Sequence, residues 1–592
     1  MNIRQLLAVA VAAAIALGAC ASSSDRAAMA HAEAAPALPA FAEAPLSAEA
    51  LLAHVNVLAS DEFEGRAPGT NGERLTLDYI SRAFAAAGLE PGARDADGRP
   101  SWLQEVPLVA ATLESPPTLT INGRDGARQY AYATQFSAWT RRVEPHVEVA
   151  SAPLIFVGYG VNAPELNWND YEGVDMRGKI AVILINDPDF ETGDDRGFGG
   201  RAMAYYGRWT YKFEEAARQH AAGAIIIHET APAAYPWAVI QSSTGSARWD
   251  IVRPDRGMSR ANFEGWMSNE VALETFRRAR LDFNELKSRA QRRGFRAVRM
   301  NMTASLALDT RIEQRTTYNV VGVLSGTGGV IAGAASRIPG VSDVLPGAGV
   351  LPGDHSDEYV LYSAHWDHLG RCPAIDGDDI CNGALDNATG VSGLIELARR
   401  ASAQGRARRS MGFIAFTAEE QGLLGALYYR DNPVFPARNT VAAINMDGLN
   451  YVGPTRDMEI VGFGKSEMDD LMTEALAAQG RRAVPDSTPE QGSFYRSDQL
   501  HLAQLGVPVL YTSNGVDLVE GGIARGEALN QAYIANNYHK PSDEVTPDWN
   551  MSGGVQDLEA LYTVGRRLAD SDRWPQWRAN AEFRAARTAS GR

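Results

Sequence analysis

Acidic and histidine residues follow three apolar segments in the second half of the chain. In sequence order they are His365 and Asp367 after 359–364, Glu419 and Glu420 after 411–417, and Asp447 after 441–446. Short apolar runs bounded by polar residues predict buried strands. Open α/β sheets bind ligands outside the carboxyl ends of their strands. Because no matching set of Lys or Arg accompanies these residues, the carboxylates at this edge predict a bound cation.

Two further residues complete the candidate ligand set. Asp386 lies between the first two strands, and His539 lies in the late stretch 537–543. Imidazole nitrogen combined with carboxylate oxygen suits zinc, whereas an all-oxygen set would suit magnesium or calcium. Two histidines and three carboxylates can hold two metal ions about 3.5–4 Å apart if one carboxylate bridges them. The residue types therefore favour zinc, in a site that can hold two ions.

These ligands require a sheet that brings distant segments to one edge. Strand and helix patterns alternate from residue 359 to about 568, with helices expected around 394–401 and 468–479. This alternation predicts an α/β fold, with a mostly parallel, mixed sheet flanked by helices on both faces. Residues 153–228 form a further block with strands and a helix of its own and few candidate catalytic groups.

Composition excludes several classes of protein. The chain has 592 residues, of which 45% are hydrophobic, and 56 Lys and Arg against 72 Asp and Glu give a net charge of −16. This is globular composition, and the acidic balance argues against nucleic acid as a partner, because binding to phosphates requires a basic face. Three cysteines are too few for a disulfide scaffold.

The first residues indicate export. An apolar run from Leu6 to Leu17 is too short to span a bilayer and predicts the core of a signal peptide. It ends in Leu17-Gly-Ala-Cys20, which resembles a bacterial lipobox, in which Cys20 is lipidated and becomes the mature N-terminus. The alternative is an ordinary secretory signal cleaved near Ala21 or Ala28. On the first interpretation the protein is a periplasmic or outer-membrane-anchored lipoprotein.

An ordered set of motifs resembles the co-catalytic dizinc aminopeptidases, a metallopeptidase family that also includes glutamate carboxypeptidase II and the glutaminyl cyclases. The motifs are His365-x-Asp367, Gly383-Ala-x-Asp386-Asn-Ala-x-Gly390, Glu419-Glu420-x-Gly422, Asn445-x-Asp447 and Tyr538-His539-x-x-x-Asp543. Residues 58–66 are similar to the family's N-terminal segment. Residues 156–179 resemble the protease-associated domain that many members insert into the catalytic fold.

The resemblance implies a role for each ligand. His365 and Asp447 would bind one Zn²⁺ ion, Glu420 and His539 would bind the other, and Asp386 would bridge the two ions.

It also implies roles for residues around the metal ions. Glu419 would be the general base that takes a proton from the attacking water and later donates it to the leaving amine. Asp367, two residues from His365 in an extended segment, would orient that imidazole. Asp543 would do the same for His539. Tyr495, in a segment similar to the family's substrate loop, is the candidate oxyanion donor.

The resemblance also gives a domain organisation. The expected segments are a signal peptide (1–19), a lipidated Cys20 and stalk (20–45), a first catalytic segment (46–134), an inserted β-rich protease-associated domain (135–305), a second catalytic segment (306–572) and a polar tail (573–592).

Several alternatives remain open from the sequence. Cys372 and Cys381 are either a disulfide, as an exported protein allows, or two free thiols. His368 and His501 have no place in the five-ligand scheme, and His501 is interpreted as structural. The expected function is removal of N-terminal residues from peptides with a free N-terminus. Carboxypeptidase action, glutaminyl cyclisation and an inactive receptor-like binding protein are the alternatives.

Overall fold

The computed structural model describes residues 36–38, 45–327 and 355–592. Pro39–Arg592 form one compact unit, which contains every element described below. The predicted signal peptide, Cys20 and most of the predicted stalk lie outside the described residues. Within the described part, no helix has both the length and the apolar character that crossing a membrane requires.

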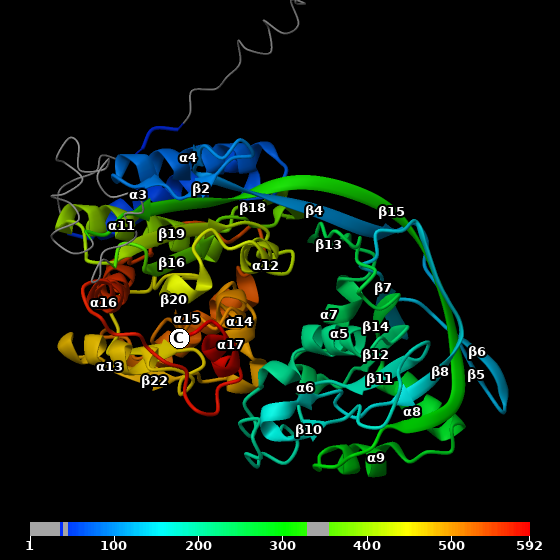
Figure 1. Cartoon of the computed structure of the whole chain (residues 1–592). Helices are drawn as coiled ribbons and strands as arrows, with labels where there is room; N and C mark the ends of the chain where they lie inside the picture. Colours follow the sequence, from blue (N-terminus) through cyan, green and yellow to red (C-terminus); the bar gives the residue numbers. More distant parts are fainter. Residues whose placement is uncertain (1–35, 39–44, 328–354) are drawn as a thin grey trace, which may run out of the picture. The chain divides into compact units, whose positions relative to one another are not determined.

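One mixed sheet carries the candidate ligands (Figure 1). Its parallel centre consists, in spatial order, of β19 (Ser410–Phe416), β16 (Tyr359–His365), β20 (Thr440–Asn445) and β23 (Val509–Ser513). β15 (Val298–Leu324) pairs antiparallel with β19, and β4 (Leu103–Leu113) pairs antiparallel with β15. β16, β19 and β20 are buried along almost their whole length, as expected of parallel strands covered on both faces. The predicted fold class is confirmed.

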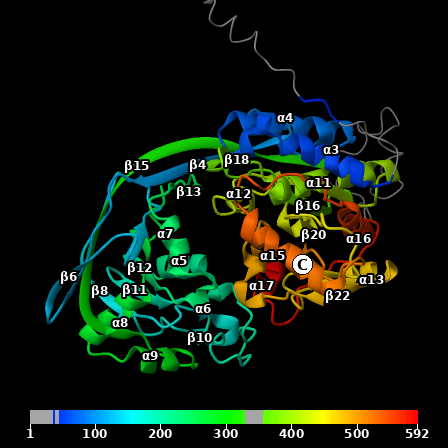
Figure 2. The ribbon, with the colours of Figure 1, turned by 180° about the vertical axis from the view of Figure 1, so that it is seen from behind.

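Helices cover both faces of this sheet. α3 (Ala48–Leu58), α4 (Asn71–Ala86) and α11 (Thr389–Gln404) lie together on one face (Figures 1 and 2). α14 (Gln499–Gln504) packs against β20 and β23 and contacts α12 (Leu424–Asp431) on the other face. Since α11 begins three residues after Asp386, its buried position on β16 helps to fix that carboxylate at the edge of the sheet.

A second sheet forms the middle of the chain. Its parallel strands are, in spatial order, β8 (His146–Phe156), β11 (Ile180–Leu184), β12 (Gly223–Ile227) and β14 (Phe263–Met267). β7 (Phe136–Trp139) pairs antiparallel with β14, and α5 (Trp209–Arg218) packs on β12. This block has its own apolar core, which includes Phe156, Val182 and Ile225.

The boundaries of this block differ from those expected at 134/135 and 305/306. β15 runs without interruption through the second boundary, because its first half pairs with β8 and its second half with β4 and β19. β5 (Leu119–Gly123) and β6 (Gly126–Tyr130) also belong to the second sheet, since β5 pairs with β15 near Thr303. Because β15 is shared by the two sheets, its strand pattern continues through the expected boundary, and the sequence shows no break there.

The expected polar tail is a packed segment. Trp577 and Phe583 are 3% and 4% exposed and belong to the apolar cluster on the α14 face of the sheet. The Arg587 guanidinium donates to the main-chain oxygens of Thr440 and Val441 on β20. The segment is polar in overall composition, but a few apolar residues pack against the sheet and hold it in place.

Candidate metal centre

Three parallel strands bring candidate ligands to one edge of the first sheet. His365 is the last residue of β16, and Glu420 and Asp447 follow the ends of β19 and β20. Because the three strands are parallel and adjacent, their carboxyl ends coincide. The predicted convergence of these residues is therefore present in the structure.

Two groups of side chains share Asp386. In the first group His365 Nε2 lies 3.3 Å from Asp386 Oδ1 and 3.1 Å from Asp447 Oδ1. In the second, His539 Nε2 lies 3.2 Å from both Asp386 Oδ2 and Glu420 Oε2. Each carboxylate oxygen of Asp386 thus faces a different histidine, which is the arrangement that a bridging ligand requires. The five predicted ligands meet at one place.

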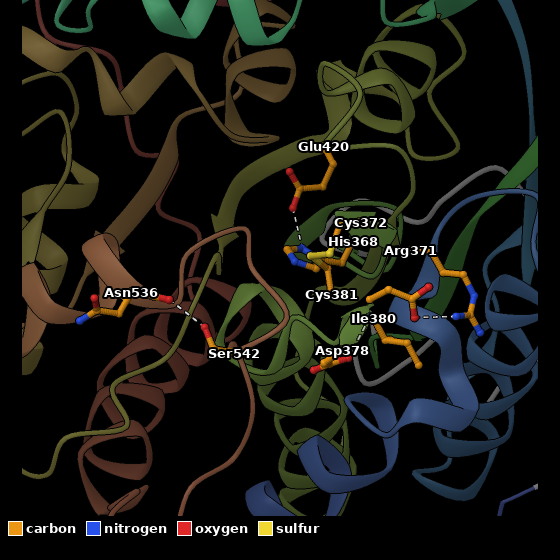
Figure 3. The surroundings of a disulfide bond; sticks show 10 residues. His368, Arg371, Cys372, Asp378, Ile380, Cys381, Glu420, Asn536 and Ser542 are labelled. Carbon is orange, nitrogen blue, oxygen red and sulfur yellow. Dashed lines mark hydrogen bonds and ion pairs between the residues drawn. A yellow bond between two sulfur atoms is a disulfide. The ribbon is translucent and has the colours of Figure 1, made fainter. Parts of the chain in front are cut away.

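His368 joins the second group, although the sequence scheme left it out. Its Nδ1 lies 2.7 Å from Glu420 Oε1 (Figure 3), and its ring centre lies 5.7 Å from that of His539. His368, Asp386 and Glu420 offer ligand atoms within 4.8 Å of one another, as do His365, Asp386 and Asp447. The signal in the sequence was its position three residues after His365, at the same strand end.

The donor set fits zinc. His368 Nδ1 and Glu420 Oε1 face each other, and His368 Nε2 is buried with no hydrogen-bond partner among the described residues. Imidazole nitrogens and carboxylate oxygens gathered at one place are the ligand types that zinc prefers. His365, Asp386 and Asp447 would hold one ion, and Glu420, His539 and Asp386 would hold the other, with His368 beside it.

Glu419 and Glu420 lie in contrasting electrostatic surroundings. Burial and the nearby carboxylates of Asp447 and Glu420 raise the pKa of Glu419 well above its ordinary value, against the charge of His365. Burial also raises the pKa of Glu420, but His368 and His539 outweigh it and lower that pKa to about 2. Adjacent carboxyl groups with pKa values pushed apart suit an ionised ligand beside a proton-carrying group.

Asp367 and Asp543 position other residues by hydrogen bonds. Asp367 Oδ1 accepts from the Glu419 amide at 3.0 Å, while the closest Asp367 atom to His365 Nδ1 is the main-chain oxygen at 3.1 Å. Asp543 accepts from the amides of Leu385 and Asp386, both at 3.1 Å. Asp543 therefore positions the shared carboxylate, whereas the sequence had suggested that it orients His539.

Arg66 holds the loop before Asp386. Its fully buried guanidinium donates to the main-chain oxygens of Leu58, Trp366, Asn382 and Gly383 at 2.6–2.9 Å. Burial lowers the pKa of Arg66 to about 10, and the surrounding carboxylates, Asp386 first, oppose that effect. The sequence pointed to this segment only through its similarity to a family motif, with no chemical role for the arginine.

Tyr495 does not present its hydroxyl to the ligands. The hydroxyl donates to Glu582 Oε1 at 2.5 Å and accepts from Lys465 Nζ at 2.8 Å. Because a buried carboxylate already holds it, this geometry does not support the oxyanion role expected of Tyr495. Tyr538 lies beside the ligands, since its ring stacks on that of His539 with centres 3.8 Å apart.

A cavity of about 510 Å³ opens beside the ligands. Glu419, Glu420 and Tyr538 line it near the metal ligands, and Tyr205, Arg208 and Trp209 line it from the second block. A peptide in this cavity would contact both blocks while its reacting bond lay near Glu419.

Comparison with known proteins agrees with this site. Residues 348–563 match the family described as Peptidase family M28. A probable zinc metalloprotease of Pyrenophora tritici-repentis is 38% identical over 91 residues, which are 15% of this chain and 20% of that protein. A probable zinc metalloprotease of Pyrenophora teres f. teres shows the same identity over 91 residues and 19% of its length. The chain thus spans about a fifth of the length of these curated relatives.

Two solved structures are similar over most of the chain. The aminopeptidase from Aneurinibacillus sp. strain AM-1 has 17% identity and a TM-score of 0.44, covering 88% of this chain and 94% of that one. BSAP, a zinc aminopeptidase from Bacillus subtilis, has 15% identity and a TM-score of 0.38, covering 91% and 97%. All candidate ligands and Glu419 fall within 348–563, the segment that matches peptidase family M28.

Proposed function

We propose that the protein is a dizinc aminopeptidase that removes N-terminal residues from peptides with a free N-terminus. The observation that carries the proposal is Asp386, whose two oxygens lie 3.3 Å from His365 and 3.2 Å from His539, with Glu419 at the same strand edge. This pattern, together with the match to peptidase family M28, supports two ions over one.

The protein's own groups then have defined tasks. Bound zinc would supply the Lewis acidity that polarises the peptide carbonyl. Glu419, at the same strand edge as the ligands, takes the proton of the attacking water and passes it to the nitrogen of the leaving amine. Asp367 holds the Glu419 main chain, and Asp543 holds that of Asp386.

The test is the metal content and turnover of the purified chain beginning at Ala21. We expect about two zinc ions per chain and hydrolysis of aminoacyl-anilides. Glu419→Ala should lower kcat by at least about 1000-fold and retain both ions, because a general base is lost without a ligand. Glu474→Ala, which removes an exposed carboxylate on α13 (Met468–Ala478), is the matched control and should leave both unchanged.

Other outcomes would select another function. Two zinc ions without anilide turnover would indicate a carboxypeptidase or a glutaminyl cyclase. No tightly held metal and no turnover would indicate a binding protein of this fold.

We also propose that the protein is exported and anchored through lipid on Cys20. The lipobox-like sequence supports this, and so does the disulfide between Cys372 and Cys381, because disulfides persist in oxidising compartments. Cells fed a labelled fatty acid should label the wild type and not Cys20→Ala. An unlabelled, secreted wild type would instead indicate an ordinary signal peptide.

A further inference from the structure

Arg208 and Arg496 line the cavity beside the candidate metal centre, and neither forms an ion pair with an acid among the described residues. Arg208 comes from the second block, at the start of α5, and Arg496 follows Tyr495 in the first block. The same cavity is lined by Glu419, Glu420 and Tyr538, so a molecule that fills it can reach both arginines and the metal ligands.

Arg208 is buried without compensation. Arg208 is only 8% exposed, and its guanidinium has no hydrogen bond or ion pair with any described residue. Burial first, and then the charge of Arg496, lower the pKa of Arg208 to about 9. A buried cation without a counter-ion is costly, and an anionic ligand would remove that cost.

Arg496 completes the pair. Its Nε donates to the main-chain oxygen of Gln491 at 2.8 Å, which fixes the guanidinium plane and leaves the other nitrogens for a ligand. Arg496 is exposed, and the groups that raise its pKa are Tyr235 and Tyr538 and not carboxylates. Both arginines line the cavity, and neither forms an ion pair with an acid among the described residues.

The other arginines on the cavity wall have protein partners. Arg141 contacts Glu264 at 3.2 Å, and Arg260 contacts Asp250 at 3.4 Å. Arg248 has no acidic partner among the described residues, but it donates to the main-chain oxygen of Ser243 at 2.8 Å and lies over the Trp139 ring at 4.5 Å. The contrast with Arg208 and Arg496 indicates that the charge of these two is available to a ligand.

We propose that Arg208 and Arg496 form an anion subsite that binds a carboxylate of the peptide substrate. The proposal rests on the peptidase function proposed above. It narrows the substrates to peptides short enough that their carboxylate lies in the same cavity as the reacting bond. That carboxylate is either the C-terminal group of a dipeptide or an acidic side chain. Guanidinium groups bind carboxylates through paired, charge-assisted hydrogen bonds, and the closed wall around Arg208 strengthens them.

Matched peptides test the subsite. We would measure kcat/KM for Leu-Leu against Leu-Leu amide, Leu-Glu amide against Leu-Gln amide, and Glu-Leu amide against Gln-Leu amide. The zinc-loaded wild type should prefer the carboxylate in at least one pair by about tenfold, which corresponds to one charge-assisted contact. The pair that shows the preference identifies whether the carboxylate is C-terminal, in the second residue or in the first.

The variants Arg208→Gln and Arg496→Gln should each reduce that preference at least fivefold. Arg260→Gln is the matched control, because Arg260 lies on the same cavity wall but its charge is already paired with Asp250. This variant should keep the wild-type preference for the carboxylate-bearing peptide. Zinc content and Tm identify any variant that is misfolded, and Arg208→Lys would then replace Arg208→Gln, because it keeps the charge and loses the paired geometry.

A binding measurement separates this proposal from the proposed function. In zinc-loaded Glu419→Gln, which should not hydrolyse peptides, calorimetry compares the Kd of each carboxylate-bearing peptide with that of its neutral counterpart. An acid preference in Kd together with no hydrolysis of any peptide by the wild type would support the subsite and overturn the aminopeptidase function. Hydrolysis with no acid preference in the wild type, or a preference that survives in both arginine variants, would overturn the subsite.

Discussion

Glu419 and Glu420 are neighbours in sequence and have opposite electrostatic surroundings. Two imidazoles, of His368 and His539, face Glu420, whereas carboxylates, including that of Asp447, face Glu419. Two adjacent glutamates in a loop are usually both exposed to solvent. Here the end of a buried strand places Glu420 between two histidines and Glu419 beside other carboxylates, and this difference favours Glu420 as the ligand and Glu419 as the proton carrier.

His368 provides a test at this scale. We expect His368→Gln to weaken zinc at the Glu420 group by about 10- to 100-fold, because the imidazole lies 2.7 Å from the Glu420 carboxylate. Zinc per chain is measured after dialysis against a graded chelator, with His220→Gln, an exposed histidine, as control. Equal zinc retention in wild type and His368→Gln would show that His368 lines the site without contributing to zinc binding.

Individual residues differ in how far the sequence could predict them. His365, Asp386, Glu420 and Asp447 were predictable because each lies at the end of a strand or before a helix, and parallel strands bring such ends together. His539 lies in the loop after α15 (Gly522–Asn536), and no strand end places it. Arg208 was not predictable, because nothing in its local pattern relates it to Arg496, which lies 288 positions later. The partners of Tyr495 and Asp543 were likewise hidden, since they depend on how segments pack.

The disulfide-bonded hairpin is an element whose stability can be tested. A disulfide between Cys372 and Cys381 joins β17 (Gly370–Ile375) and β18 (Asp378–Cys381) (Figure 3). Of the two alternatives that the sequence left open, the structure has the disulfide and not two free thiols. Changing both cysteines to serine should cost this hairpin about 2–3 kcal/mol, the loop-closure entropy of a loop of about ten residues.

Hydrogen exchange across 370–381 would measure that loss. The wild type in reductant is the control and should exchange as fast as the double serine variant. Unchanged exchange in both would mean that packing against the preceding segment Asp61–Arg66, where Gly65 lies close to the Cys381 carbonyl oxygen, holds the hairpin without the disulfide.

α14 contains a buried histidine whose charge state links stability to pH. His501 Nδ1 lies 2.8 Å from Gln504 Oε1, and burial, followed by the charge of Arg430, lowers the pKa of His501 from 6.5 to about 3. The unfolded chain therefore binds a proton at His501 below about pH 6.5, and the folded chain does not until about pH 3. The stability tied to neutral His501 is complete above pH 6.5 and falls as the pH decreases.

We expect this histidine to account for about 2 kcal/mol of the stability lost between pH 7 and pH 5, at about 1.4 kcal/mol per pH unit. His501→Gln should reduce the loss by that amount, as measured by urea unfolding at both pH values. His220→Gln should show the wild-type loss. If His501→Gln loses as much stability as the wild type, then His501 is protonated in the folded chain.

Elements could be predicted where one physical pattern dominates. The buried parallel strands β16, β19 and β20 were predicted because burial on both faces requires continuous apolar sequence. The boundary at 305/306 could not be, because β15 keeps its strand pattern while it changes partners from β8 to β4. The tail was misjudged because only a few of its residues, such as Trp577, are anchors.

The two blocks of the compact unit are joined by a ribbon and by a second contact. β4 and β15 pair over eleven residues and connect the two sheets (Figure 2). Far from this ribbon in sequence, Met203 N donates to the Pro489 carbonyl oxygen at 3.0 Å, and Tyr205 lies against Tyr495 and Phe583. Together these contacts fix where residues 205–208 stand relative to the metal ligands.

Tyr205 tests whether the second contact places the proposed anion subsite. Its ring packs between the blocks, its hydroxyl accepts from Gln504 at 3.0 Å, and Arg208 follows it by three residues. We expect Tyr205→Ala to raise KM for carboxylate-bearing peptides at least fivefold and to retain zinc, because the metal ligands lie in the other block. Tyr205→Phe keeps the ring and loses only the hydroxyl, so its KM should change less than that of Tyr205→Ala. If Tyr205→Ala keeps the wild-type KM and acid preference, the β4–β15 ribbon alone sets the position of Arg208.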